Sequence, residues 1–118
     1  MADILIVDDH KESADTLALL LKLMGHNVQT IGDGRQAIEI ARRQRPSHVL
    51  LDLGLPGLNG YQVATMLRQE PLGPLVIIAV TGYAGEDYRR QALAAGCDFY
   101  LPKPANLDTL AALLSGSD

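Results

Sequence analysis

The sequence is short of three things: cysteine, long apolar runs and excess charge. Its single cysteine, Cys97, cannot form an internal disulfide, which favours a reducing, cytoplasmic environment. The longest unbroken apolar run covers residues 75–80, far fewer than the ~20 residues that a membrane-spanning helix needs. Residues 1–3 show no basic segment of the kind that begins a secretory signal, so neither secretion nor membrane insertion is expected. The net charge of −4 argues against direct binding to nucleic acid.

The composition that is present suits one compact domain. Hydrophobic residues make up 47% of the 118 residues and charged residues 20%, a balance that excludes intrinsic disorder. A chain of this length can bury roughly 65% of the surface that it exposes when unfolded, which is enough for a real core. We therefore expect a single domain over residues 1–118.

Five short apolar segments alternate with five amphipathic segments. We expect strands at residues 4–7, 27–31, 48–51, 75–80 and 98–101, and helices at residues 12–24, 33–44, 59–69, 86–96 and 106–115. Asp33 and Asn59 stand where helix N-caps are expected, and Gly25 and Gly96 stand where helices end. Strands that alternate with helices predict a parallel sheet covered by helices on both faces, which is an α/β doubly wound fold.

Polar residues stand where four of the five predicted strands end. In a doubly wound fold the carboxyl ends of the strands share one edge, and ligands bind there, at the point where the strand order reverses. The sequence brings to this edge three carboxylates, one hydroxyl and one ammonium: Asp8, Asp9, Asp52, Thr81 and Lys103. We therefore predict a functional site at this edge.

Three carboxylates in one cleft need a cation, since their mutual repulsion otherwise raises their pKa values. A set of oxygen ligands without cysteine or a histidine pair favours a hard ion, Mg²⁺ or Mn²⁺, over zinc. The ion and the Lys103 ammonium would cancel the negative charge and admit a phosphoryl group. Asp52 is the candidate nucleophile because it ends a central strand, and the flexible turn that follows, which contains Gly54, can offer a backbone carbonyl to the metal.

Four motifs carry a resemblance to a known family: ILIVDDH (4–10), LLDLGLPGLNGY (50–61), AVTGY (79–83) and FYLPKP (99–104). Over essentially its whole length the chain resembles the receiver domain of two-component response regulators. The resemblance implies a flavodoxin-like (βα)5 fold with strand order 2-1-3-4-5. It also implies a phosphoprotein of phosphorelay signal transduction, which catalyses only its own phosphorylation and dephosphorylation.

The resemblance assigns the acidic residues to phosphoryl transfer and metal binding. Asp52 would be the phosphoacceptor. Asp9 would bind Mg²⁺ directly, Asp8 partly through water, and Asp52 and the Gly54 carbonyl would complete the protein ligands.

A second group of residues would respond to the phosphoryl group. By resemblance, Thr81 would hydrogen-bond to it and Lys103 would pair with it. Tyr100 would turn inward as a switch, and the peptide bond before Pro104 would be cis. Tyr83 and Gly54 occupy positions that influence how water reaches the acyl phosphate, with Gly54 leaving the site open and Tyr83 partly closing it.

The resemblance also implies the partners. The phosphoryl donor would be a phosphohistidine on a sensor histidine kinase or on a histidine phosphotransfer protein. The response would change the surface of the fourth helix, fifth strand and fifth helix, which a downstream protein or a second copy of the chain would read. The sequence fits both a single-domain regulator and the receiver of a hybrid histidine kinase. Residues 82–96 look somewhat closer to the receivers of hybrid kinases.

Several of these residues also have a plainer interpretation. Asp8 and Asp9 could cap the first helix, and Asp52 could cap the turn that follows it.

Lys103 could be an ordinary surface lysine that keeps its charged end in water. Thr81, at the end of its strand, could satisfy only backbone hydrogen-bonding groups. Tyr100 could be a half-buried strand residue. His10 is near enough to the predicted site to affect how it responds to pH, but it is best interpreted as a solvated residue at the entry to the first helix.

Three other classes of protein share parts of this pattern. An aspartate-nucleophile phosphatase usually carries a second aspartate two residues after the first, where this chain has Gly54. A flavodoxin needs a cradle of serine and threonine after its first strand, where this chain has two aspartates. A constitutive protein-binding module would keep the fold without phosphorylation, and it would have no need of the acidic residues.

Overall fold

Strands and helices alternate throughout residues 2–115, the part of the chain that this computed structural model describes. The strands are β1 (Asp3–Val7), β2 (Asn27–Ile31), β3 (His48–Leu51), β4 (Val76–Thr81) and β5 (Phe99–Pro102). The helices are α1 (Lys11–Leu23), α2 (Gly34–Gln44), α3 (Gly60–Arg68), α4 (Glu86–Ala95) and α5 (Leu107–Ser115). The predicted alternation is confirmed, and β4 and β5 begin and end one residue later than expected.

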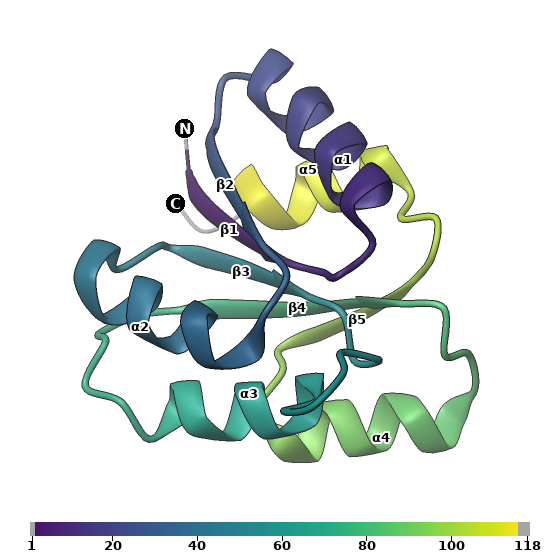
Figure 1. The fold of residues 1–118 in the computed structure, drawn as a ribbon. Coiled ribbons are helices and arrows are strands. Elements are labelled where there is room, and N and C mark those ends of the chain that lie inside the picture. Colours follow the sequence, from purple (N-terminus) through teal and green to yellow (C-terminus); the bar gives the residue numbers. More distant parts are fainter. Residues whose placement is uncertain (1, 116–118) are drawn as a thin grey trace.

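All strands of the sheet are parallel and lie in the order β2-β1-β3-β4-β5 (Figure 1). The doubly wound α/β fold and the strand order 2-1-3-4-5 are therefore confirmed. After β1 the chain moves outward to the edge strand β2, and it then crosses back to place β3 on the other side of β1. The strand order thus reverses between β1 and β3, where a doubly wound fold leaves a crevice at the carboxyl ends of its strands.

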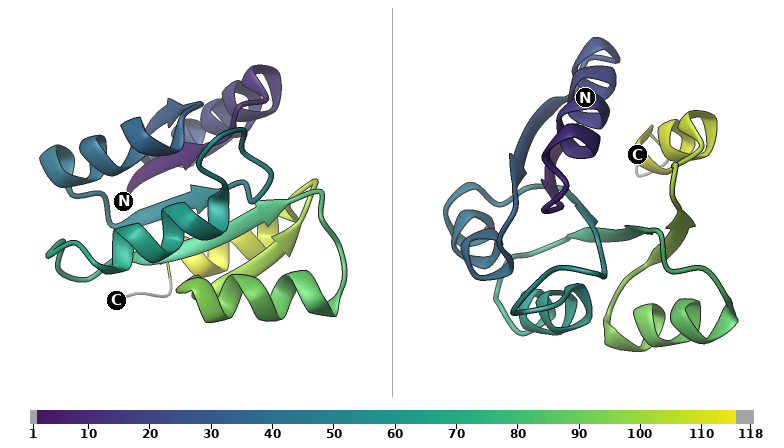
Figure 2. Two further views of the ribbon diagram at one scale, coloured as in Figure 1. Left: turned by 60° about the horizontal axis from the view of Figure 1, so that its bottom comes forward. Right: turned by 45° about the vertical axis from the view of Figure 1, so that its right-hand side comes forward.

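Alternate residues of the central strands pack into two separate cores. Leu5 and Val7 of β1 face α2, α3 and α4, whereas Ile4 and Ile6 face α1 and α5 on the other side of the sheet (Figure 2). Because successive side chains of a strand point to opposite faces, a central strand covered on both sides must be apolar throughout. β3 follows this rule except at its first residue: all four of its residues are buried, and the three after His48 are apolar.

Capping residues set the helix ends as the sequence predicts. Asp33 accepts a hydrogen bond from the Gln36 N–H at 3.0 Å at the start of α2, and Asn59 and Gln62 exchange both bonds of a capping box at the start of α3. Gly96, after α4, has a φ of 119°, a left-handed conformation that glycine adopts without strain. No helix within residues 2–115 combines the length and the apolar character needed to cross a membrane.

His48 opens β3 at the amino end of the sheet and is only 2% exposed. Its Nδ1 lies 2.8 Å from Ser47 Oγ, while its Nε2 is buried without a hydrogen-bond partner among the described residues. Burial lowers the pKa of His48 below its ordinary value, and the nearby His26 adds to this effect. His48 is therefore a buried group that resists protonation.

We expect acid to weaken the fold through His48. The imidazole is neutral in both states well above pH 6.5, its ordinary pKa, and contributes no pH dependence there. Below that pH the unfolded chain binds a proton that the folded chain takes up less readily, so the free energy of unfolding should fall. Urea unfolding at pH values on both sides of 6.5 measures the slope, and His48→Asn should reduce it. Equal slopes in the two proteins would contradict this assignment.

Candidate functional site

The acidic residues stand at the reversal point because the hydrogen bonds of the sheet continue past the strand ends. The Asp8 N–H donates to the Ile31 carbonyl of β2 at 3.0 Å, and the Asp52 N–H donates to the Val7 carbonyl of β1 at 2.9 Å. These bonds fix the start of both acidic loops against neighbouring strands. Asp8 and Asp52 are buried, with 8% and 5% of their surfaces exposed, whereas Asp9 is exposed.

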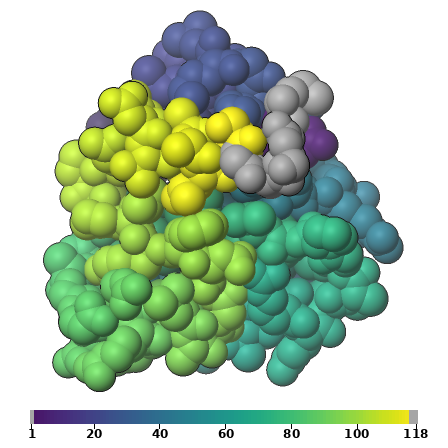
Figure 3. All heavy atoms as spheres, turned by 180° about the vertical axis from the view of Figure 1, so that it is seen from behind, coloured from purple at the N-terminus to yellow at the C-terminus, as the bar shows by residue number. Residues whose placement is uncertain are grey.

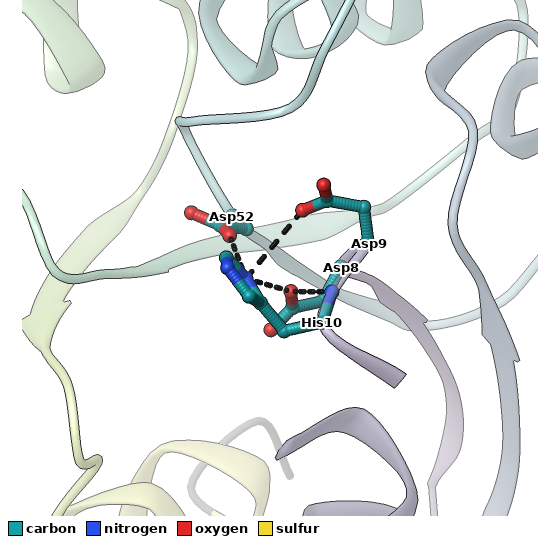
Figure 4. A group of neighbouring side chains, drawn as sticks. All are labelled: Asp8, Asp9, His10 and Asp52. Atoms are coloured by element: carbon teal, nitrogen blue, oxygen red, sulfur yellow. Dashed lines mark hydrogen bonds and ion pairs between the residues drawn. The ribbon is translucent and has the colours of Figure 1, made fainter. Parts of the chain in front are cut away.

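An imidazole lies among the three carboxylates (Figure 4). Its nitrogen, His10 Nδ1, is 3.2 Å from Asp8 Oδ1, 3.5 Å from Asp9 Oδ1 and 3.6 Å from Asp52 Oδ2. The backbone N–H of His10 also donates to Asp8 Oδ1 at 2.9 Å. The interpretation of His10 as a solvated residue at the entry to the first helix is confirmed, since His10 is the N-cap of α1 and its side chain is 67% exposed, and its ring nitrogen also faces the acids.

Lys103 brings a positive charge to the site from the loop after β5. Its Nζ donates to Asp8 Oδ2 at 2.8 Å and lies 3.3 Å from Asp52 Oδ2. Its backbone N–H donates to the Thr81 carbonyl at 2.8 Å, which extends the pairing of β4 with β5, and the bond from Lys103 to Pro104 is cis. The structure therefore brings together three residues that are far apart in the sequence.

The charges of Asp8 and Lys103 stabilise each other. Burial by itself raises the pKa of Asp8, but the Lys103 ammonium and the His10 N–H outweigh it and hold this pKa below its ordinary value. Burial by itself lowers the pKa of Lys103, but the carboxylates of Asp8 and Asp52 outweigh it and raise this pKa. Both groups are consequently charged at neutral pH, and one ammonium faces two carboxylates, those of Asp8 and Asp52.

Two glycines shape the turn after Asp52. The Gly54 N–H donates to Asp52 Oδ1 at 3.1 Å, and a Cβ at position 54 would lie 3.0 Å from Tyr83 Oη. Tyr83 therefore covers the side of the turn that Gly54 leaves free. A Cβ on Gly60 would lie 2.4 Å from the Asp52 carbonyl oxygen and 2.5 Å from Leu53 Cα, so only glycine allows α3 to begin this close to the turn.

Thr81 and Tyr100 form a second group, linked through Tyr83. Thr81 ends β4 and is 1% exposed, and its Oγ1 accepts a hydrogen bond from the Tyr83 N–H at 3.1 Å. Tyr100 of β5 is half-buried, and its hydroxyl donates to the Tyr83 carbonyl. The sequence predicted a role for Thr81 and Tyr100, but nothing in the sequence showed that the backbone of Tyr83 joins them.

The donor set at the carboxyl ends of β1 and β3 fits a divalent cation. The ligand atoms of Asp8, Asp9, His10 and Asp52 all lie within 4.8 Å of one another, close enough for one ion to reach them together. The helix cap offered as an alternative for Asp8 and Asp9 is not formed, since His10 is the N-cap of α1 and Asp8 binds the His10 N–H. The Gly54 carbonyl as a further ligand stays a prediction.

Comparison with known proteins gives a consistent family. The model of the response regulator receiver domain matches residues 4–115. The "Probable transcriptional regulatory protein TcrX" of Mycobacterium tuberculosis is 41% identical over 105 residues, which are 89% of this chain and 44% of that protein. The DNA-binding response regulator MtrA of the same organism is 39% identical over 101 residues, covering 86% of this chain and 43% of MtrA. The chain thus spans less than half the length of these curated relatives.

Solved structures agree with the sequence relatives. The chemotaxis protein CheY4 of Vibrio cholerae superposes with a TM-score of 0.90 at 26% identity, over 98% of each chain. A response regulator of Burkholderia pseudomallei, solved with a phosphorylated aspartic acid, a calcium ion and citrate, superposes with a TM-score of 0.85 at 31% identity. This match covers 95% of the present chain and 65% of the Burkholderia chain.

We expect Gly60→Ala to damage the turn that holds Asp52. The added methyl group meets backbone atoms at 2.4 and 2.5 Å, which cannot move aside without displacing β3 or α3. The free energy of unfolding should fall by roughly 2 kcal/mol, which urea denaturation measures. Gly82→Ala is the matched control because a Cβ there meets nothing within 4 Å, and its change should stay within about 0.5 kcal/mol. A similar loss in both variants would remove the special role of Gly60.

Proposed function

The chain belongs to the response regulator receiver family, and on that premise we propose that it is a phosphorylation-operated signalling domain with Asp52 as its phosphoacceptor. One observation carries the proposal. Asp52 is buried at the end of β3, within 3.3 Å of the Lys103 ammonium and beside the acids that follow β1. The Burkholderia relative with its phosphorylated aspartic acid supports this choice of residue type.

The geometry around Asp52 suits nucleophilic attack on phosphorus. The Gly54 N–H holds Oδ1, so the carboxylate keeps one orientation, while Oδ2 faces Lys103 and the ring nitrogen of His10. An oxygen of Asp52 would form the new bond to phosphorus as the bond from phosphorus to the donor nitrogen breaks, and the donor imidazole would leave with that electron pair. Lys103 would lie beside the incoming phosphoryl oxygens and offset their charge.

We place Mg²⁺, or Mn²⁺, as the cofactor among Asp8, Asp9, Asp52 and the Gly54 carbonyl. The donor chemistry supports this, because carboxylate and carbonyl oxygens are the ligands that these ions prefer. When bound, such an ion would offset the charge of the transferring phosphoryl group. Asp8 is kept ionised by Lys103 and is ready to bind a cation without first losing a proton.

The donor is proposed to be a phosphohistidine on a sensor histidine kinase or on a histidine phosphotransfer protein. A groove of about 680 Å³ runs beside Asp52 between α1 and α5, with Thr16 and Leu20 on one side and Ala105 and Leu107 on the other. A partner seated there would reach Asp52 directly. The domain itself would then catalyse only its own phosphorylation and dephosphorylation.

The output is proposed to be a change in the surface of α4, β5 and α5. These elements, drawn from green to yellow, gather on one face of the molecule (Figure 3). Aromatic side chains are exposed over α4, β5 and the loop before α4, as expected of a surface that another protein reads: Tyr83, Tyr88 and Phe99. Arg89 and Arg90 pair with acidic residues of their own helix, which leaves little free positive charge for a nucleic acid. We therefore propose a protein partner or self-association, and no direct contact with nucleic acid or membrane.

We also propose that residues 1–118 form one receiver domain of a cytoplasmic protein, either alone or as the receiver of a larger regulator or hybrid histidine kinase. A phosphatase activity of the aspartate-nucleophile type is disfavoured. Such an enzyme needs an acid two residues after its nucleophile, and here Gly54 occupies that position under the ring of Tyr83.

Asp52→Asn should abolish phosphoryl uptake. The amide nitrogen and oxygen of asparagine cannot form an acyl phosphate, so labelling by acetyl phosphate with Mg²⁺ should disappear. The measurement is the mass increase of the intact protein and its loss on mild hydrolysis. Asp87→Asn, on the exposed start of α4, is the matched control and should label normally. Undiminished labelling of Asp52→Asn would exclude Asp52 as the phosphoacceptor.

Lys103→Arg should separate phosphorylation from its structural consequence. The guanidinium keeps the positive charge near Asp8, so Mg²⁺ binding should persist, but its planar fork cannot occupy the position of a compact ammonium. Phosphorylation of the wild-type protein should change amide hydrogen exchange in α4, β5 and α5, and this change should be lost in the variant. Lys22→Arg, on α1, should behave as the wild type. Identical exchange patterns in Lys103→Arg and wild type would refute the role given to Lys103.

A further inference from the structure

β2 is an edge strand of the sheet, and one side of its backbone is unpaired within residues 2–115. It pairs with β1 alone and lies at the end of the strand order (Figure 1). The Asn27 N–H donates to the carbonyl just before β1, and the Ile31 carbonyl accepts the N–H just after β1, so these two residues turn their backbone groups toward β1. Because this direction alternates along a strand, Val28 and Thr30 turn their N–H and carbonyl groups outward.

Residues 27–31 carry none of the features that usually protect an exposed edge, such as a lysine or a proline. β2 has the sequence NVQTI, whereas β5 at the opposite edge is one residue shorter and ends on Pro102. The surface is also hollowed on both sides of β2. A hollow of about 420 Å³ lies between the strand and α1, and another of about 280 Å³ lies on the side of α2. A second strand can therefore reach this edge.

We propose that this edge is a self-association surface, on which β2 pairs antiparallel with β2 of a second copy of the chain. Pairing about a two-fold axis at Gln29 places Val28 opposite the partner's Thr30, and Thr30 opposite the partner's Val28. Each of these pairs exchanges two hydrogen bonds in an antiparallel ladder, so the outward backbone groups of both copies are satisfied. Both pairs join two β-branched side chains, which suit cross-strand contact. The strand is therefore complementary to itself.

The side of α1 next to this edge has a matching pattern of charge. Asp15, Leu19 and Lys22 are spaced so that they share one face of the helix, and all three line the hollow between α1 and β2. Asp15 lies near the carboxyl end of β2, since it also lines a hollow with Ile31. Lys22, two turns further along α1, lies nearer the amino end of β2 because the helix runs back to where that strand begins. Leu19 lies between the two charges and is 58% exposed.

The same two-fold axis brings opposite charges together. It reverses the direction of α1, so Lys22 of each copy would approach Asp15 of the other, with the two Leu19 side chains between these pairs. A contact with an apolar centre and opposite charges at its rim is typical of protein interfaces. Asp15 already pairs with Lys11 at 2.9 Å, but both side chains are exposed and such a pair is weak. This charge complementarity favours a second copy over an unrelated extended peptide as the occupant of the edge.

This surface is separate from the one proposed for the output of signalling. β2 and β5 are the opposite edges of the sheet, so association through β2 would leave α4, β5 and α5 uncovered. The contacts that carry it are backbone groups of β2 and side chains of α1, and none of them needs a phosphoryl group. The unphosphorylated chain should therefore associate already.

The experiment measures the mass of the unphosphorylated protein by sedimentation over a range of concentrations, together with amide hydrogen exchange by NMR. We expect the fraction of dimer to rise with concentration, and the exchange of the Val28 and Thr30 amides to slow as the dimer forms. The Gln29 amide faces β1 and should be protected at every concentration, so it serves as the internal control. This readout needs no variant and reports on the edge of β2 itself.

Charge variants test the orientation of the two copies. Asp15→Lys or Lys22→Glu alone places like charges together at both ends of the contact, so each should weaken association roughly 10-fold. The double variant Asp15→Lys/Lys22→Glu restores opposite charges in exchanged positions and should associate as the wild type does. Glu12→Lys makes the same change of charge as Asp15→Lys on the side of α1 that faces α5. It is the matched control and should not weaken association.

Three results would overturn the inference. The first is a protein that stays monomeric up to millimolar concentration. The second is a dimer in which the Val28 and Thr30 amides exchange as fast as in the monomer, which would place the contact elsewhere on the molecule. The third is a double variant that associates no better than the single variants. None of these results bears on Asp52, so the proposed function stands or falls by its own labelling experiment.

Discussion

Three carboxylates held at one edge of a sheet repel one another, and the arrangement of the site follows from the need to offset that repulsion. The sheet leaves them little freedom to separate, since backbone hydrogen bonds fix Asp8 to β2 and Asp52 to β1. Lys103 offsets part of the repulsion, and it reaches the acids only because β5 and the loop after it lie beside β4. The remaining negative charge favours the binding of a cation among these residues. The excess of negative charge at this edge is therefore required for function, although the repulsion among the carboxylates destabilises the fold.

The apolar strands determine where that imbalance can exist. β3 is buried along its whole length between two helical layers, so a carboxylate within it would have neither solvent nor a cation. Asp52 is the first position after the strand at which a charged group can meet Lys103 while remaining largely shielded from water. Shielding strengthens each interaction among these charges, because the effective dielectric constant is lower than in bulk water. The core that stabilises the sheet thus also strengthens the interactions among the charged groups at its edge.

Most of the fold could be predicted from the sequence, because the signals were local. Alternating apolar segments gave the strands, and Asp33, Asn59 and Gly96 marked helix ends that the structure confirms. The gathering of Asp8, Asp52 and Lys103 was predictable too, since all three follow strands of one parallel sheet. The position of the His10 ring was not, because a side chain one residue before a helix can point to solvent or to the acids, and sequence periodicity does not distinguish these. The one-residue shift of β4 and β5 arose because pairing, rather than hydrophobicity, sets where a strand ends.

The backbone of Tyr83 forms hydrogen bonds with two side chains, those of Thr81 and Tyr100, and these bonds limit how the two side chains can move. Its N–H is bound by Thr81 and its carbonyl by Tyr100, so a single residue of the loop joins the end of β4 to a side chain within β5. If Thr81 is drawn toward an incoming group, the amide that it holds is pulled or released, and the carbonyl on the same residue shifts with it. The hydroxyl of Tyr100 then loses or regains its acceptor in the same event. Such mechanical linkage through one residue makes intermediate positions costly and favours an all-or-none rearrangement over a graded one.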